Sequence, residues 1–364
     1  MKSDLEKIKA WIKLLSAPDI GNAKAIKIAR DLGEPKNILE DTSKLLDLGI
    51  ITSKTRDYFF AETDPENWQK ICDLLEQYDI QFTSILDESY PEPLKNIFDP
   101  PPFLFYRGTL QSDALRRSIA VVGTRKASNY GKLMTKRIVS DLARAQFTII
   151  SGLAYGIDTI AHLAALDNNI QTYAVMGTGV DQIYPARNRE LAERIIEDGA
   201  LISEFIPGKK AEKWNFPTRN RIISGLALGC LVAEGDKRSG ALLTAKFAMD
   251  QNRDVFALPG DINRPQAEGP NYLIKLGAKI IANANDILEE YELVINDNKS
   301  KFPKLNEEED FIYRILLQNK PEMHFDQLIV KTGYKVGELS TILLALELKN
   351  VIKKVPGNKV VPLY

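Results

Sequence analysis

Short apolar runs alternate with helical patterns through the middle of the chain, and this alternation restricts the fold more than any other feature. The runs typical of strands lie at 118–123, 147–151, 172–176, 200–204, 230–233, 255–258 and 279–282. Patterns typical of helices separate most of them, at 131–145, 158–166, 188–198, 220–228, 240–250 and 270–276. Strands that alternate with helices form βαβ units. We therefore predict an α/β fold, a mostly parallel sheet with helices on both faces.

The segment before the sheet, residues 1–80, reads as a small helical domain with polar turns. Apolar spacing continues on both sides of a Pro18-Asp19-Ile20-Gly21 turn, which Gly21 would allow to reverse tightly while Asn22 caps the next helix. The pattern is similar to a helix-hairpin-helix, whose exposed amides can bind a DNA phosphate. The alternative is a small bundle that uses the same turn only for packing. It is the favoured interpretation, because a single Pro-x-x-Gly turn is weak evidence for phosphate binding.

The segment after the sheet begins with a polar stretch, 296–306, which contains Pro303 and lacks periodicity. We interpret this stretch as a linker. The remainder, 307–364, holds three helical patterns and then a hairpin, at 308–317, 325–332, 336–349 and 351–362. Three helices followed by a hairpin is the order of a winged helix. The predicted domains are therefore 1–80, 81–295 and 307–364.

Composition limits what this architecture can do. The 48 Lys and Arg residues nearly balance the 49 Asp and Glu residues, so any nucleic-acid binding must come from a local patch. Two cysteines, Cys72 and Cys230, make no disulfide framework and fit a reducing cytoplasm. With only His162 and His324, a His-rich metal site is close to excluded, and we expect neither metal nor cofactor.

The chain also lacks membrane signals. No apolar run is long enough to span a bilayer, and the first ten residues are too charged for a signal peptide. We therefore expect a cytoplasmic protein that makes no membrane contact.

The loop after the first central strand combines a glycine with positive charge. Gly123 ends the 118–123 run, and Thr124-Arg125-Lys126 lead into the next helical pattern. A strand that ends in glycine and opens a helix leaves amides free to bind an anion. Residues 115–140 contain seven positive side chains and no Asp or Glu. Since G-x-G-x-x-G is absent, we interpret the loop as an anion site and not as a dinucleotide fingerprint.

Later strands end in loops of the same character. These loops hold Ser151-Gly152, the glycine-rich 177–188 with an aromatic and an arginine, and Ser239-Gly240 at a helix start. The most basic loop holds Lys209, Lys210, Lys213, Trp214 and Phe216, and then Arg219, Asn220 and Arg221. Cations interleaved with aromatic rings suit single-stranded nucleic acid, because they bind its phosphates and its unpaired bases. A small ligand that carries a phosphate is the competing interpretation, since arginines at helix starts serve it equally well.

The loops share one position in the predicted fold. All of them follow strand ends, and parallel strands place their carboxyl ends on one edge of the sheet. We expect one phosphate-binding pocket there, formed by the side chains of Arg125, Arg219 and Arg221 and by the amides of Gly123, Gly152, Ser239 and Gly240. Replacing Arg125 or Arg219 by alanine is then expected to weaken binding and leave the fold intact.

Catalytic signals are weak by comparison. Asp158 and His162 lie four residues apart and so share a helix face, where they could act as an acid–base pair for hydrolysis. A buried polar contact that fixes the helix start is the favoured interpretation. Neither Ser151 nor Ser239 lies in a G-x-S-x-G motif, and no Asp cluster indicates a metal-dependent nuclease. We therefore predict a binding protein and not an enzyme.

Short motifs occur in order along the whole middle segment. They are Tyr90-Pro91, Asp99-Pro100-Pro101-Pro102, Tyr106-Arg107-Gly108, Val122-Gly123-Thr124-Arg125, Ser151-Gly152-Leu153-Ala154-Tyr155-Gly156-Ile157-Asp158, Gly177-Thr178-Gly179, Phe216-Pro217-Thr218-Arg219-Asn220-Arg221, Ser239-Gly240, Pro259-Gly260 and Asn271-Tyr272-Leu273-Ile274. Together they resemble the DNA-processing protein A (DprA/Smf) family. The flanking segments are similar to that family's sterile-alpha-motif-like and winged-helix domains.

The resemblance implies an extended Rossmann-like domain that binds single-stranded DNA without enzymatic turnover. It further implies that the protein loads the RecA recombinase onto this DNA during natural transformation and relieves inhibition by single-strand binding protein. The family's DNA contacts fall on Arg125 and on the helix start Arg219-Asn220-Arg221. The loop lysines Lys209, Lys210 and Lys213 are candidates by charge alone, and so is Lys126.

The resemblance also implies a homodimer and a recombinase contact. The patterns at 270–276 and 279–282 close the sheet, and an apolar run at a sheet edge needs a partner surface. The expected dimer residues are Asn271, Tyr272 and Ile280, and the recombinase contact is expected around Met249 and Asp254.

Two other functions are alternatives. The first is a nucleotide-cleaving hydrolase of the lysine-decarboxylase-like type, which has a similar sheet. Enzymes of that type resemble one another in a Pro-Gly-Gly-x-Gly-Thr loop that is followed by a catalytic glutamate. Here the comparable strand end reads Ala233-Glu234-Gly235, and no acidic residue occurs from 239 to 249. A transcription regulator would read DNA through the winged helix, yet residues 305–364 hold eight basic and eight acidic residues. That balance favours a protein-contact or orienting role for the domain.

Overall fold

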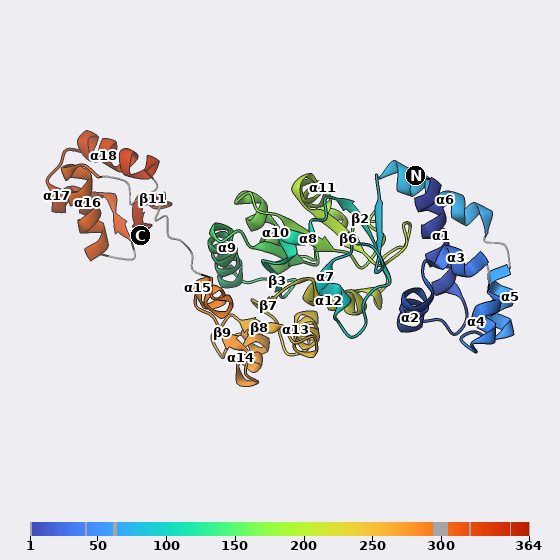
Figure 1. Cartoon of the computed structure of the whole chain (residues 1–364). Coiled ribbons are helices and arrows are strands. Elements are labelled where there is room, and N and C mark those ends of the chain that lie inside the picture. The colour runs from blue at the N-terminus through green and yellow to red at the C-terminus, as the bar shows by residue number, and fades with distance from the viewer. Residues whose placement is uncertain are drawn as a thin grey trace. The chain divides into compact units, whose positions relative to one another are not determined.

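The computed structural model of the chain describes residues 2–40, 42–60, 64–293, 305–319, 322–349 and 351–363. These residues form two compact units, which lie within 1–295 and 296–364, and each unit has its own hydrophobic core (Figure 1).

A nine-stranded sheet forms the centre of the first unit, with the order β1-β2-β6-β5-β4-β3-β7-β8-β9. The strands are β1 (Gln81–Ser84), β2 (Phe103–Gly108), β3 (Ser118–Val122), β4 (Thr148–Ser151), β5 (Thr172–Val175), β6 (Ala200–Ser203), β7 (Gly229–Val232), β8 (Asp254–Ala257) and β9 (Lys279–Ile280). All neighbours from β6 to β9 pair in parallel, which confirms the mostly parallel sheet. The sequence prediction omits β1 and β2, which pair antiparallel and extend the sheet beyond β6.

Helices cover both faces of this sheet. The longer ones are α9 (Asn129–Arg144), α10 (Ile157–Asp167), α11 (Arg189–Asp198), α12 (Asn215–Leu226), α13 (Gly240–Asp250) and α14 (Glu268–Lys275), and the shorter ones are α7 (Glu92–Lys95), α8 (Ser112–Leu115) and α15 (Asn285–Leu288). Successive residues of β3 enter different cores: Ala120 shares one with Ile222 of α12, and Val121 shares the other with Ile138 of α9. Because side chains alternate across a strand, these cores lie on opposite faces of the sheet.

The start of α12 differs from its predicted position. The helix begins at Asn215 and not at 220, so that Phe216 and Arg219 lie on its first turns and not in the preceding loop. This shift decides which side chains of the Arg219-Asn220-Arg221 run can face the same way, because a helix turns by about 100° per residue.

The helices before the sheet belong to the same compact unit. They are α1 (Lys2–Ser16), α2 (Asn22–Leu32), α3 (Pro35–Glu40), α4 (Ser43–Asp47), α5 (Ser53–Phe60) and α6 (Pro65–Gln77). Trp11 is fully buried in the core shared with the sheet, and its ring centroid lies 6.4 Å from that of Phe103. The helical character predicted for this segment is confirmed.

The predicted turn before α2 is wrong in its details. Asp19 takes the positive φ, of 63°, whereas Gly21 has a φ of −93° that any residue can adopt. Gly21 is the residue that precedes the helix, and Asn22 does not cap it. The side chain of Asn22 instead donates to Asp99, at 3.4 Å, so it ties the turn to the loop before β2.

The second unit is a winged helix, as predicted. Its elements are α16 (Glu307–Gln318), β10 (Met323–His324), α17 (Phe325–Thr332), α18 (Val336–Leu348), β11 (Ile352–Val355) and β12 (Lys359–Pro362). The strands form one sheet in the order β10-β12-β11. Most of the predicted linker, 296–304, lies outside the described residues, and its last predicted residue, Asn306, caps α16 by accepting from the amide of Glu309 at 2.8 Å.

Candidate functional site

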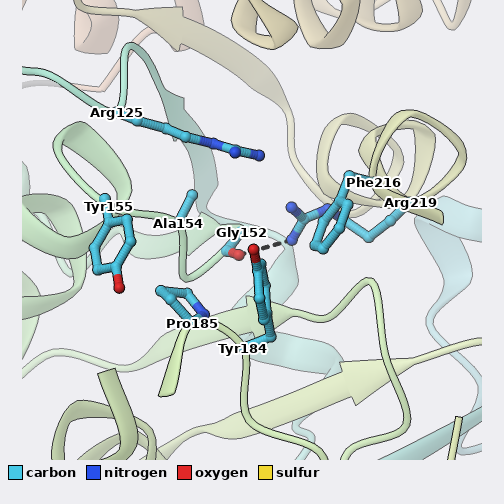
Figure 2. A pocket seen from close by; sticks show the side chains of 8 residues that line it. All are labelled: Arg125, Gly152, Ala154, Tyr155, Tyr184, Pro185, Phe216 and Arg219. Carbon is cyan, nitrogen blue, oxygen red and sulfur yellow. Dashed lines mark hydrogen bonds between the residues drawn. The ribbon is translucent and has the colours of Figure 1, made fainter. Parts of the chain in front are cut away.

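A pocket opens at the carboxyl edge of the neighbouring parallel strands β3, β4 and β5. It is lined by Arg125, Gly152, Ala154, Tyr155, Tyr184, Pro185, Phe216 and Arg219 (Figure 2). Arg125 comes from the loop after β3, Gly152 to Tyr155 from the loop after β4, and Tyr184 and Pro185 from the connection after β5. The strand ends therefore meet at one edge, as the parallel topology predicts, and α12 completes the pocket wall with Phe216 and Arg219.

One wall of the pocket is aromatic and carries a cation. The rings of Tyr184 and Phe216 lie 5.4 Å apart between centroids at an angle of 42°. The guanidinium carbon of Arg125, which is an exposed residue, lies 5.9 Å from the centroid of the Phe216 ring. A flat π-system beside an exposed guanidinium can hold a planar group by stacking and an anion by charge.

Arg219 has a different role, because it is almost completely buried, at 5% exposure. Its Nη1 donates to the carbonyl of Gly152 at 2.8 Å, the bond drawn in Figure 2, and also to the carbonyl of Val175. A Cβ on Gly152 would come within 2.5 Å of that nitrogen, so glycine is needed for this contact. Burial lowers the pKa of Arg219 to about 10, which leaves the guanidinium protonated at neutral pH.

Asp158 balances the buried charge of Arg219. Its carboxylate accepts from the amides of Gly152 and Ala154, at 3.1 and 3.3 Å. Burial raises the pKa of Asp158, and the positive charge of Arg219 opposes that shift. Asp158 thereby fixes the loop after β4 and the start of α10, which agrees with the interpretation favoured above. His162 bonds elsewhere, with Nδ1 2.7 Å from Thr172 Oγ1, so the two side chains use different partners.

Arg221 does not join the pocket, and the predicted convergence of three arginines is wrong for this residue. Its Nε donates to Asp99 at 3.1 Å and its Nη2 to Glu204 at 2.6 Å. Residues two apart on a helix point to nearly opposite sides, so Arg219 and Arg221 of α12 cannot face one ligand together. Asn220 also bonds within the chain, where its amide donates to the carbonyl of Gly240 at 3.3 Å.

The predicted cradle of free amides is wrong as well. The amide of Gly152 donates to Asp158, and the amide of Ser239 donates to the carbonyl of Asp236 at 3.1 Å. Gly123 is needed for close packing, because a Cβ there would meet Ile157 at 2.5 Å. Gly240 begins α13, so its amide belongs to the first turn of that helix.

The candidate lysines lie on the surface. Lys126 and Lys210 are exposed, and Lys209 pairs with Glu212 at 2.7 Å. Sequence reasoning placed Tyr184 and Phe216 in basic loops but did not select them, or Tyr155, as site residues. The signal that could have found them is an aromatic residue in a loop that follows a strand end, where a core position is not required.

The expected dimer and recombinase residues lie in or beside β8 and β9, at one edge of the sheet, whereas the pocket lies at its centre. Ile280, in the edge strand β9, is 55% exposed, and Tyr272 is also exposed. Asn271 is engaged within the chain, because its side chain bonds the amide and the carbonyl of Gly260 at 3.2 and 2.9 Å. A surface hollow beside this edge is lined by Met249, Arg253, Asp254, Val255, Phe256, Leu276, Gly277, Ala278, Lys279 and Glu290.

Two negative observations apply to the described residues alone. No helix among them is long and apolar enough to cross a membrane. In the same residues, no group of three or more His, Cys, Asp or Glu side chains is placed to hold a metal ion.

Two family models match the chain. The model of DNA recombination-mediator protein A matches residues 81–292, and the DprA winged helix domain matches 303–358. The DNA processing protein DprA of Streptococcus pneumoniae is 46% identical over 210 residues, which cover 57% of this chain and 73% of the relative. Protein Smf of Escherichia coli is 36% identical over 359 residues, which cover 96% of this chain and 94% of the relative.

Solved structures agree with these matches. The crystal structure of DNA processing protein A from Streptococcus pneumoniae superposes with a TM-score of 0.66 at 36% identity and covers 79% of this chain and 97% of its own. DNA processing protein A from Helicobacter pylori, described as having a unique single-stranded DNA binding mode, gives 0.52 at 27% identity over 58% of this chain and 96% of its own. With one family model spanning the whole nine-stranded sheet and a relative matching almost the entire length, the chain belongs to the DNA recombination-mediator protein A family.

Proposed function

We propose that this protein binds single-stranded DNA in the pocket of Figure 2 and acts as a recombination mediator that loads the RecA recombinase onto that DNA during natural transformation. The observation that carries the proposal is the exposed guanidinium of Arg125 over the ring of Phe216, beside Tyr184. The description of the Helicobacter pylori relative as a single-stranded DNA binder supports it. Recombinase loading and the relief of inhibition by single-strand binding protein rest on the family resemblance.

The chemistry of the pocket favours an unpaired strand. Tyr184 and Phe216 offer ring faces, and only unpaired bases expose their own faces for stacking. Arg125 and its exposed neighbour Lys126 are placed to hold phosphates, which occur in both single and double strands. The rings then discriminate single strands from double strands, and the cations supply most of the affinity. Binding is largely independent of base sequence, because every base has a face to stack.

Arg125→Ala is expected to weaken binding of a labelled oligo-dT about tenfold, since one charge-assisted phosphate contact is lost. The slope of log affinity against log salt should become flatter by about 0.7. Fluorescence anisotropy over a salt series measures both. The control is Lys132→Ala/Lys136→Ala, which removes two exposed cations on α9. If this double variant lost more affinity than Arg125→Ala, the DNA would run over α9 and not through the pocket.

We also propose that the protein binds and does not turn over its ligand. Among the described residues, none that lines the pocket is an Asp or a Glu, and the carboxylates of Asp158 and Glu234 in the neighbouring loops are both occupied. Asp158 accepts from two amides, and Glu234 accepts from the amide of Ser128 at 2.9 Å and from its hydroxyl at 2.5 Å. A general base for nucleotide cleavage needs a carboxylate free to reach water or substrate, so this arrangement disfavours the hydrolase alternative.

The winged helix is proposed as a protein-contact domain. Its third helix, α18, presents Val336, Glu338, Thr341, Leu344 and Leu348 to solvent. Three of these side chains are apolar and one is acidic, a set that does not suit base edges and phosphates. A transcription regulator that reads DNA through this helix is correspondingly disfavoured.

A homodimer through β9 and α14 is the proposed assembly, with the recombinase contact beside it at Met249 and Asp254. The exposed Ile280 at the sheet edge supports this assignment, because an apolar edge strand attracts another chain. Asn271 supports it only indirectly, by holding the loop at Gly260.

Ile280→Glu is expected to convert the dimer into a monomer, because the carboxylate would be buried in an apolar contact without a partner. Multi-angle light scattering at micromolar concentration should give twice 40.8 kDa for the wild-type chain and 40.8 kDa for the variant. Phe60→Glu is the matched control, since Phe60 is 67% exposed on α5, among the helices that precede the sheet, and the change should leave the dimer intact. A monomeric wild-type protein would contradict the assignment.

A further inference from the structure

Trp214 is an exposed aromatic residue that the pocket does not use. It directly precedes α12 and is 81% exposed, whereas Trp11 is fully buried. Single apolar residues on a surface need no explanation in themselves, so exposure alone assigns no role to Trp214. Two further features distinguish this residue: a fixed backbone and a cationic surrounding.

The backbone around Trp214 is held by hydrogen bonds on both sides. Its carbonyl accepts from the hydroxyl of Thr218 at 3.0 Å, and the amide of Asn215 donates to the carbonyl of Glu212 at 3.1 Å. The base of the loop is anchored too, because the amide of Gly208 donates to Asp181 at 2.8 Å. An indole on a fixed backbone loses little conformational freedom when a ligand stacks on it.

Trp214 lies on a different side of the helix start from the pocket wall. Phe216, two residues later, packs toward the pocket, where a Cβ on Gly177 would meet its ring at 2.8 Å. Positions two apart around a helix face different directions, and along the axis they are only about 3 Å apart. A strand that continues from the pocket past the start of α12 would bring its next nucleotides to Trp214.

The charges near Trp214 suit a polyanion. Lys210 and Lys213 are exposed in the same loop, and no ion pair is found for either within the described residues. Lys209 is the neighbour that is paired, with Glu212. An exposed indole flanked by two free ammonium groups combines a stacking face with phosphate contacts.

We propose that Trp214 is a second base-stacking site, which holds a nucleotide of single-stranded DNA outside the pocket while Lys210 and Lys213 contact the adjoining phosphates. This inference rests on the proposed function and extends its binding site along the strand. An exposed tryptophan can also anchor a protein partner. In that case its removal would leave DNA affinity unchanged, and the experiment below separates the two roles.

The first test compares Trp214→Ala and Trp214→Phe in oligo-dT binding over a salt series. Trp214→Ala should weaken binding about tenfold, and Trp214→Phe should restore most of the affinity because a ring remains. The salt slope should stay at the wild-type value in both variants, since the indole carries no charge, whereas Lys210→Ala/Lys213→Ala should flatten it. Phe98→Ala is the matched control, because Phe98 is 98% exposed but is followed by Asp99, and the nearest lysine, Lys95, is paired with Glu92 at 2.9 Å.

The second test locates the stacked base. Single abasic positions are moved along the oligonucleotide, and one of them should weaken binding to the wild-type protein and have no effect on Trp214→Ala. Quenching of tryptophan fluorescence by DNA should be smaller in Trp214→Phe than in the wild-type chain. If Trp214→Ala bound like the wild-type protein while Arg125→Ala was weakened, the inference would be wrong and the proposed function would stand. If the wild-type chain did not bind single strands, both would fail.

Discussion

Arg219→Ala should destabilise the sheet unit by about 3–5 kcal/mol, far more than a change at an exposed arginine. The substitution removes the cation that faces buried Asp158, and it leaves the carbonyls of Gly152 and Val175 without their donor. A buried carboxylate without a nearby cation and two buried carbonyls without donors both lower the free energy of unfolding. Urea denaturation followed by circular dichroism measures the free energy of unfolding. DNA binding should fall as well, because Gly152 and Phe216 lose their fixed positions.

The double variant Arg219→Ala/Asp158→Asn tests the cause. Removing the carboxylate together with its cation should recover part of the lost stability, and the two effects should not add. Arg125→Ala is the control, because an exposed arginine should leave the free energy of unfolding nearly unchanged. If Arg219→Ala unfolded like the wild-type chain and lost only DNA affinity, Arg219 would be a ligand-facing residue, as the sequence alone predicts.

The sequence is sufficient for the parallel part of the sheet and for the winged helix. Apolar runs bounded by glycine, with helical periodicity between them, are local patterns, and every predicted strand from β3 to β9 is present. The sequence does not predict β1 and β2, because these strands pair with residues that are distant in the chain. Gln81 lies opposite Tyr106, and β2 also pairs with β6, whose Ala200 lies opposite Gly108. In addition, the proline residues immediately before β2 indicate a turn or loop, so residue propensities do not predict a strand there.

The sequence also identifies the right loops for the site but not the direction of their side chains. Arg125 and Arg219 do meet at the pocket, since both positions follow from the topology. Arg221 points away from the pocket and pairs with Asp99, which lies 122 residues earlier in the chain. No local sequence pattern predicts that ion pair. The amides of Gly152 and Ser239 are likewise used by acceptors that only the folded chain brings near. Burial converts Arg219 from a presumed phosphate ligand into an internal hydrogen-bond donor.

His162 makes the stability of this unit sensitive to acid. The hydroxyl of Thr172 donates to the carbonyl of Ile149 at 2.8 Å, so it must accept from Nδ1 of His162, which therefore carries the proton of the neutral ring. The other nitrogen, Nε2, is buried and has no hydrogen-bond partner in the described part of the chain. A second proton there would create a buried charge without an acceptor. Burial, and to a lesser extent the charge of Arg219, lowers the pKa of His162 to about 3.

The free energy of unfolding should therefore fall as the pH falls from about 6.5 toward 3. In that window the unfolded chain binds a proton at this histidine and the folded chain does not, so the loss is about 1.4 kcal/mol per pH unit. Urea titrations at intervals between pH 7 and 4 measure it. Other groups titrate in the same range, so the difference from His162→Gln isolates this residue, because glutamine can donate to Thr172 and takes up no proton. A variant whose stability fell with pH as steeply as that of the wild-type chain would show that His162 is protonated in the folded protein.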